Sequence, residues 1–271
     1  MTMAMVEKGF VQVEGTKLYY ETAGEGEPVL LVHGAFMTAA IWDSTVAALS
    51  DRYRTIRFDM RGMGRSKLGT TPYRSHEDMG RLLDALGAEA VHIVGLSAGG
   101  QLAAEFALAY PSRVKSLTLV AAGMFGIPET ERKQADDAAF YEAAGRGDME
   151  AALRLWTLRW LCGPGQPEER VDASVREAFA ELSRAGLSGF ATFEMPQLLD
   201  PPALGRLGDI AVPALVVVGD LDYDDALHAA DTIAAAIPDC RMNVLKGCAH
   251  IPPMDRPEKF NGLLADFLES V

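Results

Sequence analysis

Short runs of apolar, mostly β-branched residues recur along the chain, and longer stretches of helical character separate them. The runs lie at residues 28–32, 54–58, 90–94, 114–120, 213–218 and 241–245. Short runs that are apolar throughout are typical of strands buried on both faces, as in a parallel sheet with helices on each side. The pattern therefore predicts six strands of a central sheet.

Helical patterns occupy residues 40–49, 75–86, 98–109, 224–237 and 257–268. The alternation of strands and helices predicts an α/β fold with a mostly parallel, doubly wound sheet. The first residues differ, because 10–13 and 16–21 flank a Glu-Gly turn and predict an antiparallel hairpin at one edge. Six strands and the two of the hairpin predict a sheet of eight.

The alternation stops once, in the middle of the chain. From Met124 to Met195 no strand pattern appears, and helices are predicted at residues 129–144, 148–161 and 168–187. Breakers rich in glycine and proline separate them, at 145–147 and 163–167. We therefore expect a helical cap at residues 124–195, inserted between a first part of the core at 1–123 and a second part at 196–271.

Composition narrows the choice of partners. The 271 residues are 49% hydrophobic and 23% charged, which is ordinary for a globular protein. Lys and Arg number 25 against 38 Asp and Glu, and the formal net charge of −13 disfavours nucleic acid and anionic membrane surfaces. Acidic residues gather in exposed-looking helices, at 129–137 and 168–172, which we interpret as a solubility feature. The expected partner is a small molecule, and a homodimer is a further option.

The cysteines and the first residues bear on location. Cys162, Cys240 and Cys248 cannot all pair with one another and form no C-x-x-C motif, which favours a reducing interior. Residues 1–9 lack the basic and apolar regions of a secretory signal. Apolar stretches such as 214–219 are far shorter than the roughly 20 residues that span a bilayer. We therefore expect a cytoplasmic protein without a membrane segment.

The strongest chemical signal is a G-x-S-x-G motif centred on Ser97. It follows an apolar strand and precedes the helix predicted at 98–109, which is the strand–turn–helix setting of a nucleophile elbow. Gly95 and Gly99 leave out side chains that would clash with the crossing backbone. The N-terminus of the following helix favours negative charge that develops beside the serine.

A serine needs a base to remove its proton, and the chain has five histidines. His250 is the best candidate, because it lies in a loop after the last strand, where α/β folds place their chemistry. His33 directly follows a strand and suits a loop-building role, while His92 lies within a buried strand as a core histidine. His76 begins a helix and is expected to be exposed, and His228 sits on a helix.

The histidine in turn needs an acid to orient it, and carboxylates follow the penultimate strand. Asp222 lies three residues past Gly219, far enough to clear the strand end. Asp220 is the alternative and is otherwise a loop-shaping residue. Asp224 is better placed as a helix N-cap, and Asp225 competes less well.

Together these segments resemble the α/β-hydrolase superfamily, in its branch of small serine esterases, enol-lactone hydrolases and cofactor-free haloperoxidase-like enzymes. The resemblance covers essentially the whole chain. It is carried by His33 and Gly34, a D-x-R-G-x-G-x-S segment at 59–66, the elbow at 95–99, the acid loop at 219–222 and His250. The chain order serine, aspartate, histidine is also that of this fold.

The resemblance implies a serine hydrolase without metal or cofactor, with a catalytic triad of the serine, aspartate and histidine named above. It also implies an oxyanion hole made by the backbone N–H groups of Ala35 and Ala98, with Phe36 lining the acyl pocket. Met124 and Phe125 follow a strand end and are further pocket candidates. Other aromatic residues of the cap are expected mostly to fill its own core. They are Phe140, Tyr141, Trp156, Trp160, Phe179, Phe190 and Phe193.

The expected reaction is hydrolysis of carboxylic esters of small to medium, largely apolar substrates through an acyl-enzyme. Alternatives with the same triad are hydrolysis of a lactone, an enol-lactone or a carbon–carbon bond. A non-catalytic small-molecule receptor on the same fold stays open. A metal site at Cys240, Cys248 and His250 is disfavoured, because no fourth ligand is spaced nearby. A serine at the elbow also argues against relatives whose nucleophile is a carboxylate or a thiol.

Overall fold

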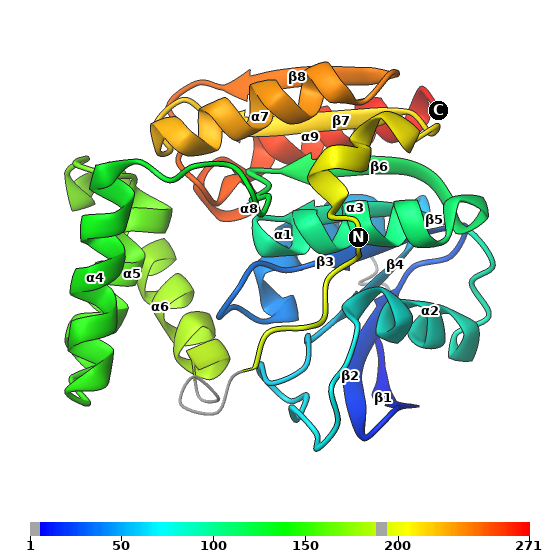
Figure 1. The fold of residues 1–271 in the computed structure, drawn as a ribbon, viewed down its shortest axis with the longest axis horizontal. Coiled ribbons are helices and arrows are strands. Elements are labelled where there is room, and N and C mark those ends of the chain that lie inside the picture. Colours follow the sequence, from blue (N-terminus) through cyan, green and yellow to red (C-terminus); the bar gives the residue numbers. More distant parts are fainter. Residues whose placement is uncertain (1–5, 188–193) are drawn as a thin grey trace.

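The computed structural model describes residues 6–187 and 194–271, and an eight-stranded sheet lies at its centre (Figure 1). The strand order is β1-β2-β4-β3-β5-β6-β7-β8. β1 pairs antiparallel with β2 and β2 with β4, and every later pair is parallel. The strands are β1 (Glu7–Val13), β2 (Thr16–Ala23), β3 (Glu27–Val32), β4 (Tyr53–Phe58), β5 (Val91–Leu96), β6 (Val114–Val120), β7 (Ala214–Gly219) and β8 (Cys240–Leu245). The predicted α/β fold is therefore confirmed, including the hairpin at one edge.

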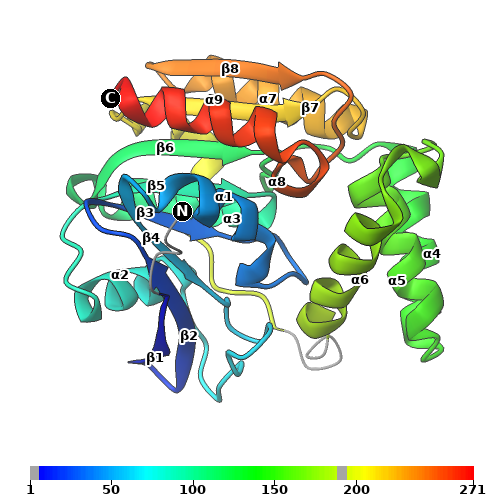
Figure 2. The same ribbon diagram turned by 180° about the vertical axis from the view of Figure 1, so that it is seen from behind.

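Helices cover both faces of the sheet because successive residues of its strands point to opposite sides and are apolar on both. In β5, Ile93 belongs to the core under α2, α3 and α7, and Val94 belongs to the core under α1 and α9. The first group of helices lies toward the viewer in Figure 1 and the second in Figure 2. The helices are α1 (Asp43–Leu49), α2 (Ser75–Ala85), α3 (Ala98–Ala109), α7 (Asp224–Ala236), α8 (Pro252–Asp255) and α9 (Pro257–Glu269).

Further helices lie between β6 and β7 and pack at the carboxyl end of the strands (Figure 1). They are α4 (Glu131–Gly145), α5 (Met149–Thr157) and α6 (Ala173–Leu187), with the π-helical turn η3 (Leu158–Cys162) and the 3-10 turn η4 (Glu168–Arg170) between α5 and α6. We call these elements the helical insertion. The division of the chain at residues 124 and 195 stays a prediction.

Two predicted helices of the insertion need correction. The helix expected at 168–187 is broken, because Val171 is buried in an extended conformation (φ −115°, ψ 134°) and α6 begins only at Ala173. The helix expected at 148–161 is α-helical to Thr157 and then widens into η3, which ends at Cys162 and is followed by Gly163 with a φ of 97°. Within residues 6–187 and 194–271, no helix combines the length and the apolar character needed to cross a bilayer.

Candidate active site

Ser97 lies in a tight turn between β5 and α3, with φ 54° and ψ −119°. A Cβ at Gly95 would lie 2.3 Å from the carbonyl oxygen of Gly99, and a Cβ at Gly99 would lie 2.4 Å from that of His33. Only glycine fits at both positions. The Ser97 N–H donates to the carbonyl oxygen of Val120 at 2.8 Å and so joins the turn to β6. Backbone packing alone therefore presents the serine at the carboxyl edge of the sheet.

Backbone strain is concentrated around this serine. Among the residues that the structure describes, the non-glycine residues with positive φ are Phe36 (54°), Ser97 (54°) and Ala121 (43°). All of them line the same pocket, and they follow three adjacent strands of the sheet. Such conformations cost of order 1–3 kcal/mol each and cluster at functional sites. The strain therefore marks this edge of the sheet as the place to look for chemistry.

His250 and Asp222 meet from the loops that follow β8 and β7. His250 Nδ1 lies 2.6 Å from Asp222 Oδ2, and both residues are buried. The backbone N–H of Tyr223 donates to Asp222 Oδ1 at 2.8 Å and fixes the carboxylate. The carboxylate favours a proton on Nδ1, which leaves Nε2 as the basic nitrogen. That Nε2 is buried, has no hydrogen-bond partner in the described part of the chain, and belongs to the pocket that Ser97 lines.

Trp160 of the helical insertion supports His250 directly. Its carbonyl oxygen accepts a hydrogen bond from the His250 N–H at 3.1 Å, and the two ring centroids lie 4.3 Å apart. Close approach of the two loops also requires Gly219, where a Cβ would lie 2.1 Å from the carbonyl oxygen of Cys248. The π-helical turn η3 therefore provides both a backbone acceptor and a packing surface for the histidine.

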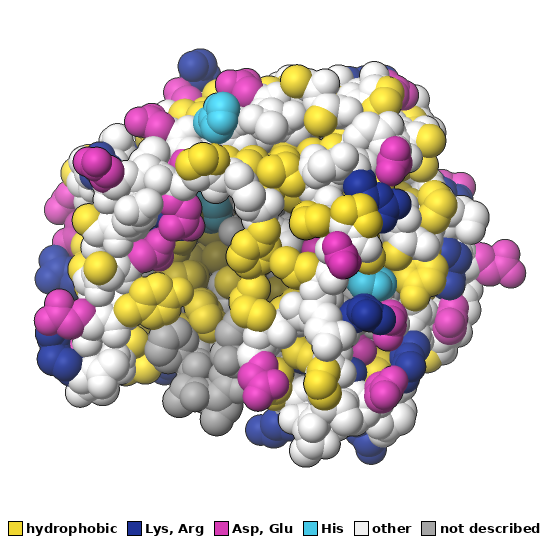
Figure 3. All heavy atoms as spheres, in the orientation of Figure 1, with side chains coloured by type: hydrophobic (Ala, Val, Ile, Leu, Met, Phe, Trp, Pro, Cys, Tyr) yellow, Lys and Arg dark blue, Asp and Glu magenta, His cyan; other side chains and the backbone are white. Residues whose placement is uncertain are grey.

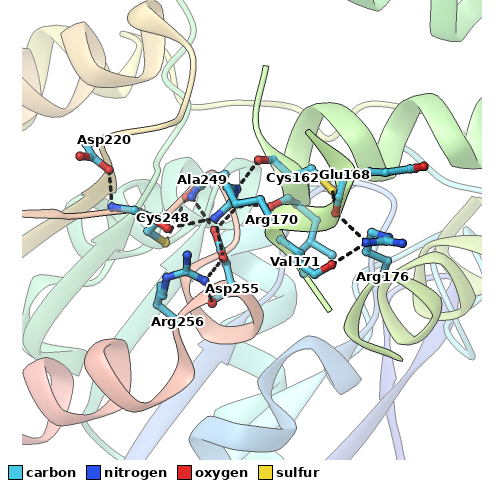
Figure 4. Close-up of polar contacts among 12 residues, drawn as sticks. Cys162, Glu168, Arg170, Val171, Arg176, Asp220, Cys248, Ala249, Asp255 and Arg256 are labelled. Atoms are coloured by element: carbon cyan, nitrogen blue, oxygen red, sulfur yellow. Dashed lines mark hydrogen bonds and ion pairs between the residues drawn. The ribbon is translucent and has the colours of Figure 1, made fainter. Parts of the chain in front are cut away.

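Arg170 ties the insertion to the same loop (Figure 4). Its Nη1 and Nη2 donate to the two carboxylate oxygens of Asp255 at 3.0 and 2.8 Å. Its remaining donors reach the carbonyl oxygens of Leu161, Cys162 and Gly247 at 2.7, 2.7 and 2.9 Å. We call this set of contacts the Arg170 clamp. It uses all five guanidinium N–H groups in one planar fork.

Asp255 joins the Arg170 clamp to the loop of the candidate base, His250. It is fully buried, and its Oδ2 accepts a hydrogen bond from the backbone N–H of Ala249 at 2.7 Å. Ala249 directly precedes His250 in the chain. Arg256 also donates to Asp255 Oδ1, at 2.7 Å (Figure 4). The position of the histidine loop therefore depends on a buried ion pair with Arg170, a residue of the insertion.

A pocket of about 530 Å³ opens above the serine. On the face drawn in Figure 3, a hollow walled mostly by hydrophobic side chains lies between the helical insertion and the sheet. The structure places every predicted site residue in the lining of this pocket except the buried Asp222 behind the histidine. The lining includes Ser97, Ala98, Ala35, Phe36, Met124, Phe125 and His250. Phe125 is 55% exposed and stands at the opening.

Several residues that line this pocket were not predicted to do so from the sequence. Trp156 and Trp160 are buried in the core as expected, but both also line the pocket, as does Tyr141. Phe140 and Phe179 are buried as expected, while Phe190 and Phe193 lie outside the described residues. The i, i+4 spacing of the tryptophans does not distinguish a helix face that meets the sheet domain from one that meets its own lobe.

The acidic segment at 129–137 is not simply a solvated face. Lys133 and Asp137 line the pocket and pair at 3.0 Å, and Asp137 also accepts from the buried Arg159 at 2.6 Å. Asp136 accepts from the hydroxyl of Tyr223 at 2.7 Å. The interpretation of this segment as a solubility feature is therefore wrong for those residues.

The other four histidines make structural contacts or lie on the surface. His33 Nδ1 lies 2.8 Å from the Gly34 carbonyl oxygen, and its Nε2 accepts from the N–H of Met60 at 2.9 Å, so it does build a loop. His92 contacts Ser116 within the core at 2.8 Å. The expectation that His76 is exposed is wrong, because it is 5% exposed beneath α3. His228 lies on the exposed side of α7.

The neighbouring acids differ from Asp222. Asp220 accepts from the N–H of Gly247 at 2.7 Å, which is a loop-shaping contact. The expected capping role of Asp224 is wrong, because Tyr223 is the N-cap residue of α7. Burial raises the pKa of the Cys248 thiol, so this neighbour of the histidine loop stays protonated. Within residues 6–187 and 194–271, no cluster of three His, Cys, Asp or Glu side chains could hold a metal ion.

Comparison with known proteins agrees with the geometry. Residues 27–257 match the alpha/beta hydrolase fold family. The chain is 34% identical to a putative carbamate hydrolase RutD from Azorhizobium caulinodans, covering 92% of this chain and 94% of the relative. It is 31% identical to a pimeloyl-[acyl-carrier protein] methyl ester esterase from Nitrosospira multiformis, covering 90% and 95%. A thermophilic esterase from Thermogutta terrifontis superposes with a TM-score of 0.80 at 25% identity, covering 97% and 98%.

Proposed function

The chain belongs to the alpha/beta hydrolase fold family, and on that premise we propose that it is a serine hydrolase of carboxylic esters. One observation carries the proposal: the imidazole of His250 is held at Nδ1 by Asp222 at 2.6 Å, and its Nε2, in the pocket that Ser97 lines, has no partner among the described residues. A base, its orienting acid and a hydroxyl on a strained elbow are the parts that acyl transfer needs.

In the first half of the proposed reaction, the Ser97 Oγ attacks the ester carbonyl while His250 Nε2 takes its proton. The imidazolium that forms is stabilised by Asp222. The carbonyl oxygen becomes an oxyanion, for which the backbone N–H groups of Ala35 and Ala98 are the proposed donors. When the intermediate collapses, the bond to the alcohol breaks, His250 gives its proton to the leaving oxygen, and an acyl-enzyme remains.

In the second half, water replaces the alcohol. His250 removes a proton from the water as it attacks the acyl carbonyl, and the same N–H groups hold the second oxyanion. Collapse breaks the bond to Ser97, whose oxygen takes the proton back, and the carboxylic acid leaves. Every proton is therefore handled by one imidazole, and no cofactor is needed.

The pocket supports substrates of small to medium size with apolar groups near the reacting carbonyl. Its volume of about 530 Å³ suits a small molecule and not a polymer. Phe36, Met124 and Trp156 form apolar walls close to the serine. The esterase activity named for the relative from Nitrosospira multiformis and for the solved Thermogutta structure further supports ester cleavage.

The test is hydrolysis of p-nitrophenyl acetate and butyrate by the purified protein. Ser97→Ala should lower kcat/KM by at least about 10³-fold, with an unchanged melting temperature, while Ser112→Ala on the surface should behave as the parent. Unchanged turnover by Ser97→Ala would refute the proposal. Failure of a fluorophosphonate to label Ser97 would favour a non-catalytic receptor. Faster turnover of lactones, enol-lactones or vinylogous diketones than of any ester would instead favour the alternatives with the same triad.

A further inference from the structure

A second cavity, of about 190 Å³, adjoins the pocket of Ser97. It lies between α3, the loop after β6 and the 3-10 helix η6 (Ala203–Asp209), which packs on α3 (Figure 1). Gln101, Met124 and Phe125 line both cavities. The rest of its wall is apolar apart from Glu105, with Leu198, Pro202 and Leu204 opposite α3. The two cavities therefore follow one another along α3.

Glu105 is an unusual residue for such a wall. It is 1% exposed, and its Oε1 accepts a hydrogen bond from Gln101 Nε2 at 3.2 Å. Its Oε2 is buried without a hydrogen-bond partner among the described residues, and His76 Nδ1, at 3.9 Å, is too far away to donate to it. A buried carboxylate oxygen without a donor is costly. Glu105 Oε2 therefore has the capacity to accept one more hydrogen bond, and a rotation of the side chain would turn this enclosed oxygen toward the cavity that the residue lines.

The spacing along α3 relates this carboxylate to the serine. Ser97, Gln101 and Glu105 are four residues apart and follow one another along one side of the helix. At 1.5 Å per residue, Glu105 lies about 12 Å along the axis from Ser97, and its side chain leans back toward the serine. An extended chain gains about 1.2 Å per bond. A substrate chain of about eight bonds covers roughly 10 Å, and the hydrogen bond from its terminal donor covers the remaining distance to the carboxylate.

We propose that the second cavity is a subsite for the far end of the substrate chain, and that Glu105 there binds a hydroxyl or ammonium donor. Gln101 supports this role, because its Nε2 orients the carboxylate while its Oε1 accepts from the N–H of Phe125 at 2.9 Å. The same amide thus fixes the loop that separates the two cavities. The proposal rests on the proposed function for the position of the reacting carbonyl, but its test does not require turnover.

The experiment measures binding to the Ser97→Ala protein, which cannot turn substrate over by the proposed mechanism. Calorimetry would compare methyl octanoate with methyl 8-hydroxyoctanoate and with methyl 8-aminooctanoate. The hydroxyl or the ammonium should improve the dissociation constant at least tenfold over the plain chain. Added Glu105→Met, which keeps the length of the side chain but removes its acceptors, should abolish that preference. Added Glu258→Met, an exposed site at the start of α9, should leave it unchanged.

Each outcome decides between a binding role and a purely structural one. If Glu105 only balances His76 inside the core, Glu105→Met lowers the melting temperature but leaves the ratio of the dissociation constants unchanged, and the proposal is overturned. Equal binding of all three esters by the Ser97→Ala protein, without a second substitution, overturns it as well. If Glu105→Met does not fold, Glu105→Gln should reduce the preference for the ammonium more than that for the hydroxyl. If the protein with Ser97 intact cleaves no ester while the Ser97→Ala protein keeps the preference, the proposed hydrolase function is refuted and the subsite is retained.

Discussion

The two halves of the candidate active site are held by different means. On one side, Ser97 is positioned by backbone against backbone, with glycines at the places where any side chain would collide. On the other side, His250 is positioned by the Arg170 clamp, a buried ion pair that joins the helical insertion to the histidine loop. The first half belongs entirely to the sheet domain. The second half exists only where two distant parts of the chain meet.

Because of this difference, the two halves should respond differently to amino-acid substitution. Close packing of backbone atoms offers no alternative arrangement, so a single added methyl group must displace a strand or the helix. A network of hydrogen bonds can lose one member and keep the others, but it leaves a buried charge behind. We therefore expect a steep loss in the first half and a graded loss in the second.

Among substitutions that change only the packing or the ion pairs around the site, the largest effect should come from Gly99→Ala. The new Cβ would lie 2.4 and 2.5 Å from the carbonyl oxygens of His33 and Val32, so the elbow must shift. We expect kcat/KM for p-nitrophenyl butyrate to fall by more than about 10²-fold, since displacement of the reacting groups by 1 Å has effects of that size. Gly262→Ala in α9, where the Cβ meets nothing within 4 Å, is the matched control and should keep full activity. Normal turnover by Gly99→Ala would show that the elbow is not rigid.

A smaller but clear effect should follow Arg170→Met. It removes one of the two arginine partners of the buried Asp255 and frees the loop before His250. Because Arg256 still pairs with Asp255 Oδ1, stability should fall by less than the roughly 3–5 kcal/mol of a buried charge left without any partner. We expect kcat to fall about tenfold and KM to change less, because the substitution frees the loop of the proposed base more directly than the pocket walls.

Urea unfolding and steady-state kinetics check this prediction. Arg184→Met is the control, because that ion pair with Glu150 is exposed, screened by solvent and should contribute little to stability. Adding Asp255→Asn to Arg170→Met should cost less than the sum of the single changes. Strict additivity would mean that the two residues do not act as one clamp.

The smallest effect should appear as a pH dependence of the elbow half. Burial lowers the pKa of His33 below its usual 6.5, because its ring is enclosed and its Nε2 must stay unprotonated to accept from Met60. Below pH 6.5 the unfolded chain therefore takes up a proton that the folded chain does not, and stability decreases as the pH falls. Burial also lowers the pKa of His92, with the same sign.

Unfolding midpoints in urea between pH 5 and pH 8 measure this slope. His33→Asn should flatten the slope, and His92→Asn should flatten it separately. His228→Gln, on the exposed side of α7, should leave it unchanged. If His33→Asn retains the full slope of the parent, other groups govern the acid sensitivity of this half.

The sequence predicted the features that depend on local rules. The short apolar runs indicated the strands, and the glycines around Ser97 indicated the elbow, because both are visible within a few neighbouring residues. The Arg170 clamp could not be predicted, since Arg170 and Asp255 are 85 residues apart and nothing in either neighbourhood names the other. The same holds for Trp160, whose i, i+4 spacing with Trp156 indicates one apolar helix face but not what that face contacts. His76 was misplaced because the start of a helix does not reveal whether another helix covers it.

The left-handed backbone of Ser97, Phe36 and Ala121 has a consequence for any attempt to improve this protein by selection. Glycine is relaxed at such φ values, so glycine at Ser97 or Ala121, where little side chain is lost, should raise the melting temperature, whereas at Phe36 the loss of a buried ring outweighs the relief. At Ser97 that gain would come with complete loss of the proposed nucleophile. A screen that selects only for a higher melting temperature would therefore favour more stable variants that have lost activity. It should be paired with a screen for turnover.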